Sequence, residues 1–184
     1  MTTNNSANLI NVASGSQIGS IKVVTLTAST SANLELTGLS ALYSKYEFVY
    51  DGLIPDTDNV SFEALIGSVA NGYINVNYGL QSIDHTGTQA HSAAGNTGAI
   101  ILAQTVTNGG AFAAVVGTGT LVAQHEPNIS ATLISNVQSA NSVIVWSASS
   151  GSNYDNTDDI TKIKFQFSTG NILSGRIFVY AYPI

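Results

Sequence analysis

Cysteine is absent from this sequence of 184 residues, and methionine and tryptophan each occur once. Without cysteine the chain has no disulfide, no thiol nucleophile and no thiolate-bound zinc or iron–sulfur cluster. A hydrophobic core and hydrogen bonds must therefore hold the fold. The missing cysteines do not indicate a cellular compartment.

Charged residues are also scarce, at 9 % of the chain against about 25 % in an average globular protein. The formal net charge is −6, from 11 acidic and 5 basic residues. We therefore expect Ser, Thr, Asn and Gly to cover most of the surface. Nucleic acid is not an expected partner, because phosphate contacts need a basic patch and the basic residues are scattered. They are Lys22, Lys45, Lys162, Lys164 and Arg176.

Long hydrophobic runs are missing as well. No apolar run approaches the roughly 20 residues of a membrane-spanning helix. Residues 1–20 have neither the basic region nor the continuous apolar region of a secretory signal. The sequence thus predicts a soluble protein with no membrane partner. Residues 1–20 form a polar segment with apolar anchors, which we expect to be an extended arm that contacts a partner through Leu9, Ile10 and Val12.

What the sequence does contain is a strand pattern. From Ile21 onward, apolar and polar residues alternate with period two between clusters of Gly, Asn, Ser and Pro. The pattern predicts an all-β fold, an antiparallel β-sandwich of jelly-roll-like topology, with an arm over 1–20 and a single domain over 21–184. An up-and-down barrel is the alternative. The expected strands lie at 21–27, 32–39, 46–55, 60–67, 72–83, 99–106, 111–124, 130–137, 142–149, 160–167 and 176–182.

Three local features refine this pattern. Pro55 cannot donate to a strand ladder, so it is expected to end its strand before a turn at 56–59. Gly117 and Gly119 predict a bulge or a bend. Residues 84–98 have little apolar content and are expected to form a long loop.

The last 27 residues predict a closing hairpin. In 160–167 apolar side chains alternate with Lys162 and Lys164, which are expected on an edge or on a solvent face. Residues 168–175 supply the turn, with Gly170 or Asn171 suited to positive φ. The return strand is apolar and aromatic on both faces, which predicts burial either between sheets or beneath a neighbouring subunit. Its candidate partner contacts are Phe178, Tyr180 and Tyr182.

Two groups of residues raise the question of a metal. His85 and His91 with Asp84 fall in the expected loop, but their spacing matches no ligand motif and a Gly/Ser/Thr loop is a poor cage. The aspartates of two turns resemble calcium ligands, but the central Gly and the distal Glu of a calcium loop are missing. Turn capping explains them instead, so no metal is expected. These aspartates are Asp56 and Asp58 in one turn and Asp155, Asp158 and Asp159 in the other.

No arrangement of residues predicts catalysis or a cofactor. A nucleophilic serine lacks its G-x-S-x-G elbow. Glycosidases need two carboxylates in a cleft, whereas Glu35, Glu47 and Glu63 fall on the outward faces of their strands. The Gly-rich residues 116–120 continue into a strand and not into the helix that a phosphate loop needs. The sequence therefore predicts a protein that is not an enzyme.

Three tyrosines in or beside expected loops are candidates for stacking on a sugar ring. They are Tyr73, Tyr78 and Tyr154. An exposed tyrosine on a β-sandwich can bind a glycan, but tyrosine is equally common in strand cores and in protein interfaces. Both alternatives stay open.

Two segments resemble a recurrent pattern in tailed-bacteriophage virion proteins. In "LELTGLSALYSKYEFVYDGLIPDTDNVSFEALI" (34–66) a Thr-Gly-Leu and a Tyr lead into a strand and a Pro-x-x-Asp-Asn turn. In "ITKIKFQFSTGNILSGRIFVYAY" (160–182) an Ile-x-x-Ile-x-Phe strand, a Ser-x-Gly-Asn-Ile turn and a Gly-x-Ile-x-x-Tyr strand follow one another. Residues 67–157 do not match the pattern, and there we expect specificity to lie.

The resemblance implies a virion structural protein that is assembled in the host cytoplasm. Its leading form is an oligomeric capsid decoration or cement protein, commonly a trimer, that binds the major capsid protein or other virion subunits. The alternative is a tail or head fibre, or a receptor-binding module, that recognises a host surface glycan. Head, tail and fibre locations remain alternatives at this point.

Overall fold

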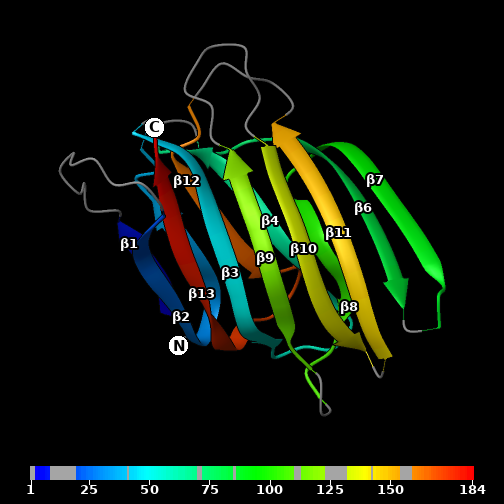
Figure 1. The fold of residues 1–184 in the computed structure, drawn as a ribbon. Helices are drawn as coiled ribbons and strands as arrows, with labels where there is room; N and C mark the ends of the chain where they lie inside the picture. Colours follow the sequence, from blue (N-terminus) through cyan, green and yellow to red (C-terminus); the bar gives the residue numbers. More distant parts are fainter. Residues whose placement is uncertain are drawn as a thin grey trace.

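The computed structural model describes residues 3–8, 20–40, 42–69, 72–84, 86–109, 113–122, 132–141, 143–153 and 159–184. Within these ranges the chain forms strands and no helix (Figure 1). The part described accordingly holds no helix of the length and hydropathy needed to cross a membrane. The strands are β1 (Thr3–Asn8), β2 (Ile21–Thr37), β3 (Tyr43–Pro55), β4 (Val60–Ser68), β5 (Gly72–Tyr73), β6 (Val76–Asp84), β7 (Gln89–Thr97), β8 (Ile100–Val106), β9 (Val115–Val122), β10 (Thr132–Asn141), β11 (Val143–Asn153), β12 (Lys162–Phe167) and β13 (Ile172–Pro183).

The predicted all-β, antiparallel architecture is confirmed. The strands form one hydrogen-bonded sheet with the order β5-β4-β12-β2-β13-β3-β9-β10-β11-β6-β7, and β8 is paired to β4. Every pairing is antiparallel except that of β1 with β2, which is parallel. The sheet is curled, so that its two ends form the two layers of a sandwich.

Strand β2 joins the two layers. Its first half, Ile21–Ser31, pairs with β13, and its second half, Leu34–Thr37, pairs with β12. Thr30 adopts a φ of 54° close to the end of the first half. The predicted strands 21–27 and 32–39 are therefore one bent strand of 17 residues, because a strand can change layers at a bend without interrupting its hydrogen bonds.

Aromatic side chains from both layers fill the core. Phe48 and Tyr50 of β3 meet Phe62 of β4 and Phe165 of β12, with ring centroids 5.1–6.1 Å apart. Each of these rings lies on the inward side of an alternating strand, as period two predicts.

The two C-terminal strands do not form the predicted hairpin. β12 pairs with β4 and β2, whereas β13 pairs with β2 and β3, so β2 lies between them. The connection 168–171 thus links one layer to the other. Lys162 and Lys164 point outward from an interior strand and not from an edge. Gly170, with φ 77°, supplies the predicted left-handed residue.

The predicted long loop at 84–98 is also wrong. Gln89–Thr97 forms β7, which pairs with β6 along its length. None of the residues of β7 is buried. Period-two hydrophobicity appears only where one face of a strand is buried, so this strand carried no such signal.

Serine also lines part of the core. Ser135 of β10 and Ser147 and Ser149 of β11 are buried. β8 packs across these small side chains. At Gly151 the approach is so close that a Cβ would lie 2.6–2.9 Å from three side-chain atoms of Ile100.

The predicted distortion at Gly117 is present where β3 and β9 pair. Their register shifts between Tyr50 and Leu53, and Gly117 adopts a φ of 149°. A Cβ at Gly117 would lie 2.2 Å from the carbonyl oxygen of Asn136. Glycine is required here because the backbone of β10 approaches too closely for any side chain.

Candidate interaction surface

Charge is distributed unevenly over the described sheet. β9, β10, β11, β6 and β7 are neighbours and contain no Lys, Arg, Asp or Glu except Asp84, the last residue of β6. We call the outward-facing side chains of these five strands the uncharged face. The described strands of the other half carry the charges, at Lys22, Glu35, Lys45, Glu47, Asp51, Glu63, Lys162, Lys164 and Arg176.

The cross-strand register places the side chains of the uncharged face in rows. The central row runs Thr118, Asn136, Ala148, Gln81 and His91, one residue from each of β9, β10, β11, β6 and β7. Five strands at a spacing of about 4.8 Å give a face about 24 Å wide. Its side chains are neutral, and most of them are short.

Three large apolar side chains are exposed on this face. The exposed fractions are 39 % for Val116, 52 % for Ile134 and 46 % for Trp146. They come from three adjacent strands, and Trp146 lies opposite Gln138 in the β10–β11 ladder. One exposed apolar residue is normal for a soluble protein, but several on one uncharged face are typical of an interaction site.

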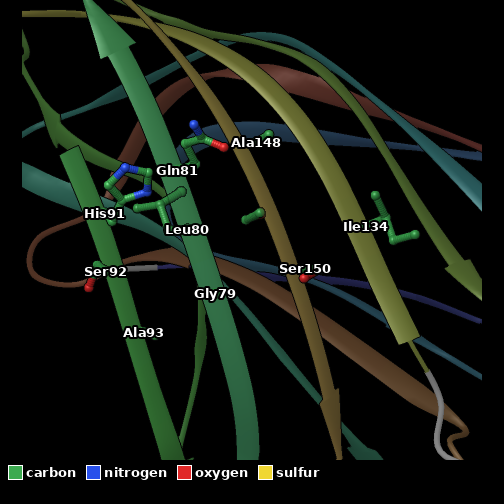
Figure 2. A pocket seen from close by; sticks show the side chains of 10 residues that line it. Gly79, Leu80, Gln81, His91, Ser92, Ala93, Ile134, Ala148 and Ser150 are labelled. Carbon is green, nitrogen blue, oxygen red and sulfur yellow. The ribbon is translucent and has the colours of Figure 1, made fainter. Parts of the chain in front are cut away.

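A shallow groove of about 730 Å³ crosses the uncharged face over β10, β11, β6 and β7 (Figure 2). Its floor consists of small residues, among them Gly79, Ala93 and Ala148, and Ile134 flanks one side. Gln81 and His91 are paired across β6 and β7 and flank the other side. The groove thus offers apolar contact and two hydrogen-bonding side chains, an amide and an imidazole.

The predicted contact residues of the last strand lie on the charged half. Phe178, Tyr180 and Tyr182 point outward from β13 and are half-buried, whereas the alternate residues Val179 and Ala181 are fully buried. The prediction that both faces of β13 are buried between sheets is therefore wrong, because only one face of β13 meets the core. Burial of the other face beneath a neighbouring subunit stays a prediction.

Cations of the same chain lie over the rings of Phe178 and Tyr182 on β13. The Lys45 Nζ atom lies 4.0 Å from the centre of the Tyr182 ring, and the Lys22 Nζ atom lies 4.7 Å from that of Phe178. The Tyr182 hydroxyl donates to the Glu47 carboxylate, and this hydrogen bond raises the pKa of Tyr182. These side chains already have partners within the chain.

The two candidate tyrosines in the described range lie on strands of different layers. The Tyr73 hydroxyl of β5 donates to the Glu35 carboxylate at 2.6 Å, and the Nζ atoms of Lys162 and Lys164 lie 4.3 and 4.5 Å from its ring centre. Burial, followed by the bond to Glu35, raises the pKa of Tyr73. Tyr78 of β6 packs against the core. The structure does not bring these two rings together with those of β13.

The residues considered for metals do not form a described ligand cluster. His91 is exposed on β7, and Asp84 instead accepts hydrogen bonds from the amides of Thr86 and Thr88, both at 2.9 Å. Among the residues that the structure describes, no three His, Cys, Asp or Glu side chains converge on a possible metal position. His85, Asp155 and Asp158 lie outside the described residues, as do the candidate contacts Leu9, Ile10, Val12 and Tyr154.

Asp56 caps a turn and also bridges two turns. Its Oδ1 atom accepts hydrogen bonds from the Asn171 amide at 2.8 Å and the Thr57 hydroxyl at 2.9 Å, and its Oδ2 atom accepts from Asn171 Nδ2 at 2.8 Å. Asp58 accepts from the Asn108 amide at 2.8 Å. The Asn171 amide hydrogen bond is the largest cause that lowers the pKa of Asp56. Both carboxylates face N–H or O–H donors, which fits the predicted capping role.

Asp56→Asn is expected to lower the melting temperature by about 2–4 °C at pH 7, an amount that corresponds to about 1 kcal/mol in a chain of this size. Because the folded-state pKa of Asp56 lies below the unfolded value of 3.8, its stabilisation is fully present above that pH and is lost as the pH falls. Thermal unfolding of both proteins between pH 7 and pH 2 should show the difference shrinking below about pH 4. Thr57→Ala removes one hydrogen-bond donor to Asp56 and keeps the carboxylate. The melting temperature of this variant should therefore retain part of the pH dependence that Asp56 gives the native protein. A difference that stays constant down to pH 2 would contradict this role.

The uncharged face and its exposed residues, Trp146 above all, were not predicted from the sequence. The usual assumption that apolar residues point inward predicts a buried Trp146, whereas its side chain points outward. Here the inward positions of β11 are Ser147, Ser149 and Gly151, and the tryptophan alternates with them. The available signal was that Glu126 is the only Lys, Arg, Asp or Glu in residues 86–153 of the sequence.

No protein-family model matches the chain, and neither the curated proteins nor the solved structures show a match. The fold and surface alone define the class: an all-β protein with one curled antiparallel sheet and a broad neutral face.

Proposed function

We propose that this protein is a non-enzymatic structural protein of a tailed-bacteriophage virion, an oligomeric decoration or cement protein that binds neighbouring subunits through the uncharged face. The observation that carries the proposal is the segregation of charge, which leaves five adjacent strands neutral. The resemblance of residues 34–66 and 160–182 to virion proteins supplies the virion context.

The uncharged face suits permanent attachment to another subunit. Its area is on the order of 500 Å², from about 24 Å across the strands and about 20 Å along them. One side of a standard protein interface buries about 800 Å², so the face supplies a large share of one interface. Binding through neutral side chains buries no unpaired charge and is insensitive to salt.

The two segments that resemble virion proteins build one structural unit, and the unmatched middle builds the face. The segments meet at the bridge between Asp56 and Asn171 and where the Ser61 amide donates to the Ser168 hydroxyl at 3.1 Å. β12 and β13 also pair with β4 and β3. β9, β10, β11, β6 and β7 all lie within 67–157. A common scaffold with a variable binding face fits a protein family that attaches to different virion surfaces.

Ile134→Lys is expected to reduce the number of copies on purified particles at least tenfold, because a charge in a desolvated interface centre costs several kcal/mol. The measurement is quantitative mass spectrometry of particles from the phage that encodes the chain, with cryo-EM to locate the density. Leu173→Lys is the matched control, since Leu173 is 45 % exposed on β13, away from the uncharged face. Equal incorporation of both variants, or absence of the native protein from particles, would overturn the proposal.

The groove favours a second candidate, a receptor-binding or fibre module for a neutral host surface glycan. Gln81 and His91 lie side by side over a floor of small residues (Figure 2). Planar amide and imidazole groups hydrogen-bond sugar hydroxyls, and the groove needs no charge to do so. The test measures binding of purified native protein and of Gln81→Ala to host polysaccharide. Binding by the native protein that is lost in Gln81→Ala would establish the glycan function in place of the cement function.

A further inference from the structure

Strand β7 ends the described path of the sheet and has a free edge. It pairs with β6 on one side, and the strand order ends there. Gln89, Ala90, His91 and Ala93 are exposed, and Ser92 and Ala94 are partly exposed. Among the described strands, none pairs with its outer edge.

This edge lacks the usual protection against pairing. Natural edge strands carry lysine, inward charges or proline, or are covered by other elements. β7 contains none of these residues. By comparison, the first half of β2 carries Lys22, and β8 is largely buried, with Ile100, Leu102 and Val106 inaccessible to solvent.

β7 also gains little stability within its own chain. None of its residues is buried, so it contributes almost no hydrophobic free energy. Ordering each residue of its backbone costs about 1–2 kcal/mol, and each ladder hydrogen bond returns only about 1 kcal/mol. A second ladder on the free edge would stabilise it.

The flat part of the edge is short and well defined. The β6–β7 register shifts between Val76 and Tyr78, and Asn96 adopts a φ of 55°. The Asn96 amide donates to Asn77 Oδ1 at 3.0 Å. This bulge twists the end of the strand, so a partner strand can pair with Gln89–Ala94.

We infer that β7 pairs antiparallel with β7 of a second copy across a two-fold axis, which joins two sheets into one. A second copy is the occupant favoured by charge. Each chain carries a net charge of −6, so contact through the charged half would be repulsive, whereas β7 contains no Lys, Arg, Asp or Glu and its neighbour β6 contains only Asp84, at its last position. The contact is independent of the virion role, since the virion partner binds the face and the second copy binds the edge.

The symmetry of such a pair makes a specific demand. In an antiparallel pair, opposite residues point to the same face of the sheet. A two-fold axis perpendicular to the sheet therefore passes beside one residue of β7, which lies opposite its own copy. Residues one position away face a different residue, and those two positions away lie too far from their own copies.

Single-cysteine variants at each position from Gln89 to Ala94 test this geometry, and the cysteine-free chain makes every cross-link interpretable. The expected result is one position within the six that forms a disulfide-linked dimer under mild oxidation, at least tenfold more efficiently than its neighbours. Opposite Cβ atoms in a ladder lie about 4.5–5.5 Å apart, close to disulfide geometry. Thr118→Cys lies on β9, within the uncharged face. Efficient cross-linking of this variant would indicate that the uncharged faces of two copies stack on each other instead.

Ala93→Lys supplies an independent measurement without cysteine, with Ala93→Ser as its control. Light scattering of the native protein should give a dimer, and Ala93→Lys should weaken its dissociation constant at least tenfold while Ala93→Ser leaves it unchanged. A native protein that stays monomeric would overturn the inference. So would equal cross-linking at adjacent β7 positions, or efficient cross-linking only at Thr118→Cys. The readout is purified protein without particles, so its failure is distinct from failure of the virion role.

Discussion

Phe165→Ala is expected to lower the free energy of unfolding by about 4 kcal/mol, within the range of about 3–5 kcal/mol for a deleted core phenylalanine. Phe165 is fully buried where the two layers meet. Its ring centre lies 5.1 Å from that of Phe48, 5.6 Å from that of Tyr50 and 6.1 Å from that of Phe62. Both layers supply these rings, so a cavity here removes contacts from both.

Urea denaturation of the native protein and the variant measures this effect. Phe178→Ala is the control, because Phe178 is half-buried on the outward face of β13. Removing it should cost about 1–2 kcal/mol, since part of its surface is already in water. A loss below about 2 kcal/mol for Phe165→Ala would mean that the aromatic cluster does not hold the layers together.

Gly151→Ala is expected to cost about 2–3 kcal/mol, although it adds a single methyl group. The new Cβ would lie 2.6 Å from Ile100 Cγ1, 2.7 Å from Cδ1 and 2.9 Å from Cγ2. Ile100 is fully buried and branched at Cβ, so it cannot rotate away cheaply. The methyl group would push β8 away from β11.

Gly79→Ala is the matched control for this substitution. Gly79 of β6 lies opposite Ser150 of β11. A Cβ added to Gly79 would meet nothing within 4 Å. Its stability should change by less than about 0.5 kcal/mol. If the overlap with Ile100 causes the loss, Gly151→Ala should cost at least about 1 kcal/mol less in an Ile100→Ala background. Additive effects in the two backgrounds would contradict the close approach.

Much of the candidate site was beyond sequence reasoning, for reasons that particular residues make clear. Trp146 faces outward because Ser147 and Ser149 occupy the inward positions, and only their place against β8 makes this arrangement favourable. His91 and Gln81 are neighbours because β7 pairs with β6 in one register. The expected contacts Phe178 and Tyr182 were found on β13, but the cations that cover them come from β2 and β3.

The sequence by itself determined features that depend on one or a few neighbouring residues. Alternation of apolar residues determined the all-β class, and Phe165 and Phe48 point inward as that alternation requires. Pro55 ended β3 because it has no N–H to donate, and Gly170 took positive φ because it has no Cβ.

Only the tertiary structure decided which strands became neighbours. β12 and β13 are four residues apart in the chain, yet β2 lies between them, because each pairs where its apolar face is buried best. β7 formed without any apolar pattern because backbone hydrogen bonds to β6 sufficed. The uncharged face arose in the same way: strands from three separate stretches of sequence, with Asp84 as their only Lys, Arg, Asp or Glu, assembled side by side, since strand pairing is non-local.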